Sequence, residues 1–146
     1  MNTLSTEITF DAAHRLWGYK GKCFFVHGHT YRLKVFVSSD VLDDQGFVID
    51  FGDLKKIVKT YIDDKWDHTL ILNMIDPIYG LLEDQGIKIH LLDENPTVEF
   101  MSRVIYQSLK ELLPKDVKLK QVTIWETSTC SNTYTESDKL ELEEAE

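Results

Sequence analysis

Two stretches near the start of the chain alternate between apolar and polar residues, which is the pattern of half-buried β-strands. Over residues 4–14 the even positions hold most of the apolar side chains and end on His14. Over residues 27–37 the odd positions are the apolar ones, and they begin with His27 and His29. Because successive strand residues point to opposite faces, we expect all three histidines on the buried face of neighbouring strands.

Helical spacing appears in two later segments. The first begins at Asp50, which can act as an N-cap, and then repeats apolar residues every three to four positions. The second begins at Asn95 and Pro96, an N-cap followed by a proline at the first helical position. Strand character returns over 117–128 and again over 132–135. This order of strand, strand, helix, helix, strand, strand predicts an α+β domain with helices on one face of an antiparallel sheet.

The length and composition fit one globular domain. The chain has 146 residues, of which 42% are hydrophobic and 28% charged, so it can bury a core. We expect a single domain over 1–135 and an acidic, disordered tail over 136–146. The edges of so short a sheet predict oligomerisation through edge strands.

The charge balance limits the classes of partner. The formal net charge is -9 and the sequence pI is about 5.0, which argues against a nucleic-acid partner and against an anionic membrane surface. No apolar run approaches the roughly 20 residues of a membrane span, and the first residues do not form a secretion signal, so we expect a cytoplasmic protein. Two cysteines are too few for a disulfide scaffold.

A small anionic ligand stays compatible with this charge. Much of the negative charge lies in the tail, and four cations lie close in sequence to the three histidines. We therefore expect a locally positive field near the histidines, which could favour a small phosphorylated ligand. The four cations are Arg15, Lys20, Lys22 and Arg32.

The segment His27-Gly28-His29 has the spacing of a metal site, because its two imidazoles lie on one side of an extended chain. Gly28 allows the backbone to come close to whatever the histidines hold. With His14, three neutral nitrogens around an open fourth position predict a catalytic zinc site. The alternative is that these are satisfied core or turn histidines that hold no metal.

A thiol and a carboxylate–imidazole pair extend this candidate site. Cys23 lies four residues before His27, so it is either a fourth ligand that closes a structural zinc site or a thiolate that serves as base or nucleophile. The spacing leaves both roles open. In Asp67-His68 a carboxylate could orient an imidazole that polarises the thiol, or the two could form a surface pair.

Glu126 is unusual because a carboxylate shares the parity of two apolar strand residues. A buried carboxylate needs partners, and the N–H edge of a cyclic amidine or guanidine would supply two in parallel. The alternative is a solvent-facing residue at a sheet edge. Thr97 and Glu99 begin the second helix, where polar residues are commonly capping groups.

Six short motifs resemble the 6-pyruvoyltetrahydropterin synthase family, and they follow in order over almost the whole chain before the acidic tail. The three-residue spacing between the cysteine and the His-Gly-His segment resembles the bacterial branch that makes 6-carboxytetrahydropterin in queuosine biosynthesis. The six motifs are Phe10–His14, Cys23–His29, Val48–Phe51, Asp67–His68, Asn95–Glu99 and Trp125–Thr127.

The resemblance implies the T-fold, in which such units join edge to edge into a barrel, usually as a hexamer of two trimers. It implies 7,8-dihydroneopterin triphosphate as substrate, and 6-carboxytetrahydropterin, acetaldehyde and triphosphate as products. For the site, it implies zinc at His14, His27 and His29. It also implies Cys23 as the catalytic base, Asp67 and His68 as its activators from the same or a neighbouring subunit, and Glu126 as the pterin anchor, supported by Thr127 and Thr97.

Three alternatives stay open on the sequence. The same fold could make 6-pyruvoyltetrahydropterin, or could cleave dihydroneopterin as an aldolase. It could also be a non-catalytic, zinc-stabilised binding module with Cys23 as fourth ligand. Cys130 lies near Glu126 and is a second candidate thiol, but we expect Cys23 to react because its neighbours are the histidines.

Overall fold

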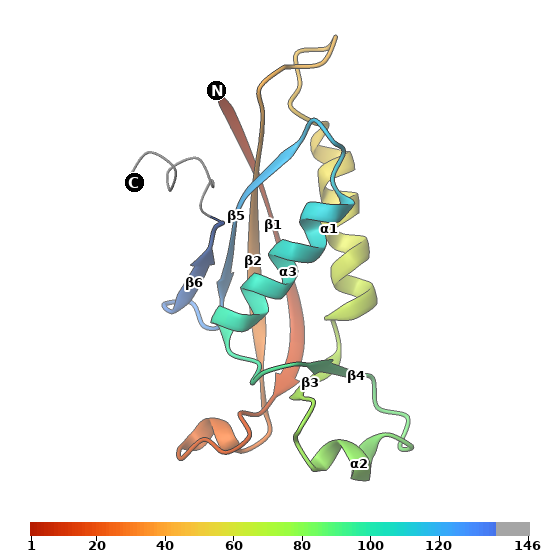
Figure 1. Ribbon diagram of the computed structural model, residues 1–146, viewed down its shortest axis with the longest axis vertical. Coiled ribbons are helices and arrows are strands. Elements are labelled where there is room, and N and C mark those ends of the chain that lie inside the picture. Colours follow the sequence, from red (N-terminus) through yellow and green to blue (C-terminus); the bar gives the residue numbers. More distant parts are fainter. Residues whose placement is uncertain (137–146) are drawn as a thin grey trace, which may run out of the picture.

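The computed structural model describes residues 1–136, which form one six-stranded sheet with two long helices on one face (Figure 1). The strands are β1 (Asn2–His14), β2 (His27–Ser39), β3 (Thr69–Asn73), β4 (Ile89–Leu92), β5 (Lys118–Trp125) and β6 (Ser131–Tyr134). The helices are α1 (Phe51–Lys65), α2 (Ile78–Leu82), α3 (Val98–Leu112) and a single 3-10 turn, η1 (Lys22–Phe24).

The sheet has the order β4-β3-β1-β2-β5-β6. The long pair β1 and β2 is antiparallel along its whole length, and the register sets His14 opposite His27. β5 and β6 continue the antiparallel arrangement on one side. The predicted α+β class with helices on one face is confirmed. On the other side β3 and β4 pair in parallel, so these two short strands, together with α2, are elements that the sequence pattern did not predict.

The two long helices begin in different ways. Asp50 caps α1 as predicted, because its carboxylate accepts the backbone N–H groups of Gly52 and Asp53. The predicted cap of α3 was wrong by two residues. Thr97 is the N-cap, and its hydroxyl accepts the N–H of Phe100 at 3.2 Å. The side chain of Asn95 bonds elsewhere, as described below.

The core lies between the sheet and the helices, on the face that alternation predicted. Along β1 the buried face runs through Phe10 and Ala12 to His14, and along β2 it runs from His29 to Tyr31 and onward. The histidines thus occupy the last positions of a packed apolar face, where both strands are held rigidly. The helices complete the core on the side facing the sheet with Leu54, Val58, Ile62, Met101, Ile105 and Leu109.

The chain end and the last strands refine the predicted boundaries. β5 ends at Trp125, earlier than expected, so Glu126 lies just beyond the strand. Glu136 is described and pairs with Lys110 at 2.7 Å, whereas the rest of the predicted tail, 137–146, lies outside the described residues. Among residues 1–136, no helix is long and apolar enough to cross a membrane.

Candidate metal centre and active site

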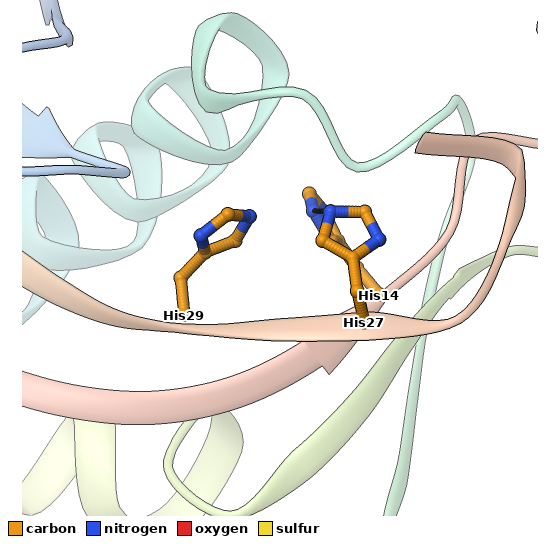
Figure 2. Close-up of side chains that lie close together, drawn as sticks. All are labelled: His14, His27 and His29. Atoms are coloured by element: carbon orange, nitrogen blue, oxygen red, sulfur yellow. Dashed lines mark hydrogen bonds between the residues drawn. The ribbon is translucent and has the colours of Figure 1, made fainter. Parts of the chain in front are cut away.

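Three imidazole rings converge where β1 ends and β2 begins (Figure 2). One nitrogen from each of His14, His27 and His29 lies within 4.8 Å of the others. Gly28 permits this approach, because a Cβ there would lie only 3.1 Å from the carbonyl oxygen of Ala12 on β1. The predicted triad is therefore brought together by the strand pairing itself.

The outer nitrogens of two rings are bonded to backbone carbonyls, which fixes the tautomers. His14 Nδ1 lies 2.8 Å from the oxygen of Pro96, and His27 Nδ1 lies 2.7 Å from the oxygen of Phe25. A carbonyl only accepts, so each Nδ1 carries the hydrogen and each Nε2 keeps a lone pair. The two Nε2 atoms face each other at 3.1 Å. Two lone pairs at that distance repel unless a cation or a proton lies between them.

The third ring, that of His29, has a nitrogen without a hydrogen-bond partner. His29 Nε2 is buried and makes no hydrogen bond to any of the described residues. A carboxylate oxygen of Glu126 lies 3.5 Å from this nitrogen, which is an ion-pair contact only if His29 is protonated. Three inward nitrogens with no satisfied partner are what an open trigonal metal site presents, and the fixed Nδ1 bonds are the usual support for such ligands.

Burial favours the neutral form of two of these ligands. Burial lowers the pKa of His14, against the opposing bond to Pro96, and the charge of His27 adds to the lowering. Burial also lowers the pKa of His29, although the charge of Glu126 opposes it. A metal ion binds neutral imidazole, so at neutral pH it need not displace a proton from either ring.

A cavity of about 290 Å³ opens beside the rings, at the lower end of the range for small-molecule sites. Cys23, a half-buried free thiol from η1, and Glu126 both line it, so the structure brings the predicted base and the predicted anchor to one space. A larger hollow of about 890 Å³ lies between α3 and β5 and contains none of the predicted site residues. The smaller cavity is lined by His14, Leu16, Cys23, Thr97, Val98, Glu99, Glu126, Cys130 and Ser131.

The two predicted threonines have structural roles of their own. Thr97 lines the cavity, but its oxygen caps α3. Thr127 does not line the cavity, and its oxygen accepts the N–H of Cys130 at 3.2 Å. With the bond from the N–H of Glu126 to the oxygen of Cys130, at 3.0 Å, this closes the loop that carries Glu126. Thr127 therefore shapes the loop that presents the carboxylate.

The Asp67–His68 pair is formed but lies apart from this cavity. Asp67 accepts the backbone N–H of Asp11 at 2.9 Å and lies 2.7 Å from His68 Nδ1. These bonds, from Asp11 and then His68, outweigh burial and lower the pKa of Asp67. His68 has a positive φ of 57°, and its side chain is 77% exposed. Among residues 1–136, no hydrogen bond or ion pair joins either residue to Cys23.

The arginines do not form the positive cluster that the sequence suggested. Arg15 is neutralised by Asp76, a buried carboxylate that it meets with two nitrogens at 2.6 and 2.5 Å. Arg32 stacks over Trp125 at 3.8 Å and pairs with Glu7, on the parity opposite to the histidines. Sequence reasoning could not foresee Asp76, because nothing local marks a carboxylate as the partner of a cation 61 positions away.

Comparisons with known proteins agree on one family. The family model for 6-pyruvoyl tetrahydropterin synthase matches residues 3–137. A 6-carboxy-5,6,7,8-tetrahydropterin synthase of Haemophilus influenzae is 36% identical over 143 residues, which cover 93% of this chain and 100% of that protein. The synthase of the same name from Rickettsia felis is 35% identical over 128 residues, covering 85% of this chain and 93% of that protein.

The solved structures confirm the T-fold. The 6-pyruvoyl tetrahydropterin synthase of Caenorhabditis elegans superposes with a TM-score of 0.69 at 27% identity and covers 93% of this chain and 96% of its own. An uncharacterised protein from Wolinella succinogenes reaches a TM-score of 0.79 at 20% identity, over 93% of this chain and 98% of that one. The latter shows the likeness of fold alone.

Proposed function

This chain belongs to the 6-pyruvoyl tetrahydropterin synthase family, and from that premise we propose that it is a zinc-dependent lyase of queuosine biosynthesis. Its proposed substrate is 7,8-dihydroneopterin triphosphate, and its proposed products are 6-carboxy-5,6,7,8-tetrahydropterin, acetaldehyde and triphosphate. Relatives that carry the 6-carboxytetrahydropterin synthase name support this branch. The observation that carries the proposal is the triad of unsatisfied imidazole nitrogens beside a cavity that also holds Cys23 and Glu126.

His14, His27 and His29 would hold the zinc ion. Bound there, zinc would supply Lewis-acid polarisation of the hydroxyl oxygens on the substrate side chain. The protein supports this by keeping His14 neutral and by fixing the Nδ1 atoms of His14 and His27 on backbone carbonyls, so that both Nε2 atoms face inward.

Cys23 and Glu126 divide the remaining work. Glu126 accepts the N–H edge of the pterin ring and thereby sets which carbon faces the thiol. Cys23 takes and returns a proton on the side-chain carbons, a general-base role that suits a half-buried thiol at the rim of the cavity. Cys130 lines the same cavity but is exposed, which makes it the weaker candidate for this step.

The Asp67–His68 pair activates the thiol of a neighbouring copy in this proposal. The pair is assembled, but its imidazole is largely exposed and does not line the cavity of its own chain. An edge-to-edge oligomer, such as a hexamer of two trimers in the cytoplasm, would bring the pair to a second copy's Cys23.

Product analysis tests the proposal directly. The zinc-loaded protein is incubated with 7,8-dihydroneopterin triphosphate, acetaldehyde is trapped, and the pterin product is identified by mass. We expect equimolar acetaldehyde and a 6-carboxy product. A 6-pyruvoyl product without acetaldehyde would assign the chain to the biopterin-type activity, and a dihydropterin product would assign it to aldolase-type cleavage.

The role of Cys23 separates catalysis from a structural zinc module. We expect Cys23→Ala to keep zinc and thermal stability but to lose turnover, while the matched variant Cys130→Ala keeps all three. Loss of both zinc and folding in Cys23→Ala would instead support a closed site with Cys23 as its fourth ligand.

A further inference from the structure

We propose that Asn95 is a positioning residue that holds the thiol loop in register with the three histidines. The thiol loop is the segment 15–26 that connects β1 to β2 and carries Cys23. The structural part of this proposal, that Asn95 holds the loop in place, does not depend on the reaction. The expected effect on turnover rests on the proposed function.

The side chain of Asn95 clamps one residue of this loop at both of its backbone groups. Its Oδ1 accepts the N–H of Trp17 at 3.0 Å, and its Nδ2 donates to the carbonyl of Trp17 at 2.9 Å. The same Oδ1 also accepts from Nδ2 of Asn73 at 3.2 Å, while Oδ1 of Asn73 accepts the N–H of Ile75. A flipped amide would set donor against donor at Trp17 and at Asn73, so only one orientation satisfies the network.

The clamp reaches Cys23 through two short steps. Leu16 adjoins Trp17, and its N–H donates to the carbonyl of Cys23 at 2.8 Å, which joins the two arms of the loop. The ring of Trp17 also packs against Phe24 at 5.9 Å between centroids. The guanidinium of Arg15 lies over both rings, 5.2 and 5.1 Å from their centroids. The position of Trp17 therefore sets the position of the thiol.

The residues that follow Asn95 reach the other parts of the site. The carbonyl of Pro96 accepts from His14, and Thr97 caps α3 and lines the cavity. Three consecutive residues thus tie the thiol loop, a metal ligand and a helix start to one point. This explains why Asn95 does not cap α3, since its Oδ1 already accepts from both Trp17 and Asn73.

The test measures the thiol itself, in a Cys130→Ser background that leaves Cys23 as the single thiol. Iodoacetamide alkylation of Cys23 is followed by mass in Asn95→Ala and Asn95→Asp. We expect alkylation to become at least about fivefold faster in both, because a released loop opens more often. The aspartate is the conservative variant, since it keeps an acceptor for Trp17 but places an oxygen against the Trp17 carbonyl.

Steady-state kinetics add a second measurement. We expect kcat to fall about tenfold with KM within about twofold, because a displaced base loses alignment while the binding groups remain. Zinc content should not change. If the parent protein has no turnover with the pterin substrate, the proposed function fails, and the alkylation result still decides the role of Asn95.

The matched control is Asn132→Ala. Asn132 is also a half-buried asparagine with a side-chain bond, to Ser102 at 2.7 Å, but it does not touch the thiol loop. We expect its alkylation rate to match that of the parent even where its thermal stability falls as much as that of the Asn95 variants. Unchanged alkylation in both Asn95 variants, or equal acceleration in Asn132→Ala, would overturn the proposal.

Discussion

The histidine cavity and the Asp67–His68 pair are built in opposite ways. The cavity is formed within one chain, and its lining groups come from the end of β1, η1, the start of α3 and the loop after β5. The pair is equally well formed, but its imidazole is 77% exposed and does not line this cavity. The groups of the histidine cavity are therefore distinguished by their burial, and the Asp67–His68 pair is distinguished by its access to solvent.

Under the proposed function, the difference corresponds to a division of work between copies of the chain. Metal binding and substrate anchoring need fixed, desolvated groups, which one chain supplies. The exposed pair has its hydrogen bonds in place but does not contact the Cys23 thiol of its own chain. It would therefore act on the thiol of a second copy that docks against it. It follows that the two regions should fail separately when each is altered.

The largest effect is expected for loss of one metal ligand. Structural zinc sites with four ligands bind with roughly 10–16 kcal/mol, and a comparable share of about 4 kcal/mol per histidine here means that His14→Ala should weaken zinc binding by about 10³-fold. Chelator competition measures the affinity. His90→Gln is the control, because His90 stacks on Trp66 outside the triad. Unchanged zinc affinity in His14→Ala would show that the triad is not the zinc site.

A loss of turnover without loss of zinc is expected for the exposed pair. His68→Ala removes a proposed general acid–base group and should lower kcat by about 10²-fold while zinc content stays at the parent level. The stronger test is co-expression with inactive Cys23→Ser. Mixed oligomers regain activity if the pair acts on a neighbouring copy, and they remain inactive if it acts within its own chain.

Acid should weaken metal binding in a defined direction. Burial holds the pKa values of His14 and His29 below the ordinary 6.5, so both stay neutral above that value. Zinc affinity should be flat from pH 8 to pH 7. It should then fall as the pH drops through the lowered pKa values, by about tenfold per pH unit for each ligand protonated. Competition titrations from pH 8 to pH 5 check the profile, and a decline that begins above pH 7 would contradict it.

The smallest effect concerns the support of one ligand. The Tyr31 hydroxyl is fully buried and lies 3.3 Å from His14 Nδ1, whereas the Pro96 carbonyl lies closer, at 2.8 Å. Tyr31→Phe keeps the ring packed on Phe10 and should weaken zinc binding by about tenfold at most. A loss as large as that of His14→Ala would show that Tyr31, not Pro96, orients the ring.

Alternation along the chain predicted that the three histidines would lie together. The parity of β1 and β2 placed His14, His27 and His29 on one face, because a strand whose period is two leaves a side chain no other choice. The parity of β5 likewise placed Glu126 near the triad, although β5 ends at Trp125, one residue before Glu126. Periodicity carries this information only in long strands.

The elements that sequence reasoning missed have little local signal. β3 is five residues long and buried throughout, so it shows no alternation, and β4 has four residues. The start of α3 was misplaced because Asn95, a good N-cap by type, finds better partners in a segment 78 positions away. The pairing of Arg15 with Asp76 was hidden for the same reason. Side chains that bond across such distances are determined by the packed fold.

Gly28 has a consequence for redesign of the metal preference. A methyl group at this position would lie only 3.1 Å from the carbonyl oxygen of Ala12, so the β1 backbone would have to shift slightly to admit it. The flanking imidazoles can be exchanged for other donor types, since each only has to reach inward. The spacer between them leaves little room for a side chain, so directed evolution of the proposed metal site should explore the ligands and leave the glycine codon untouched.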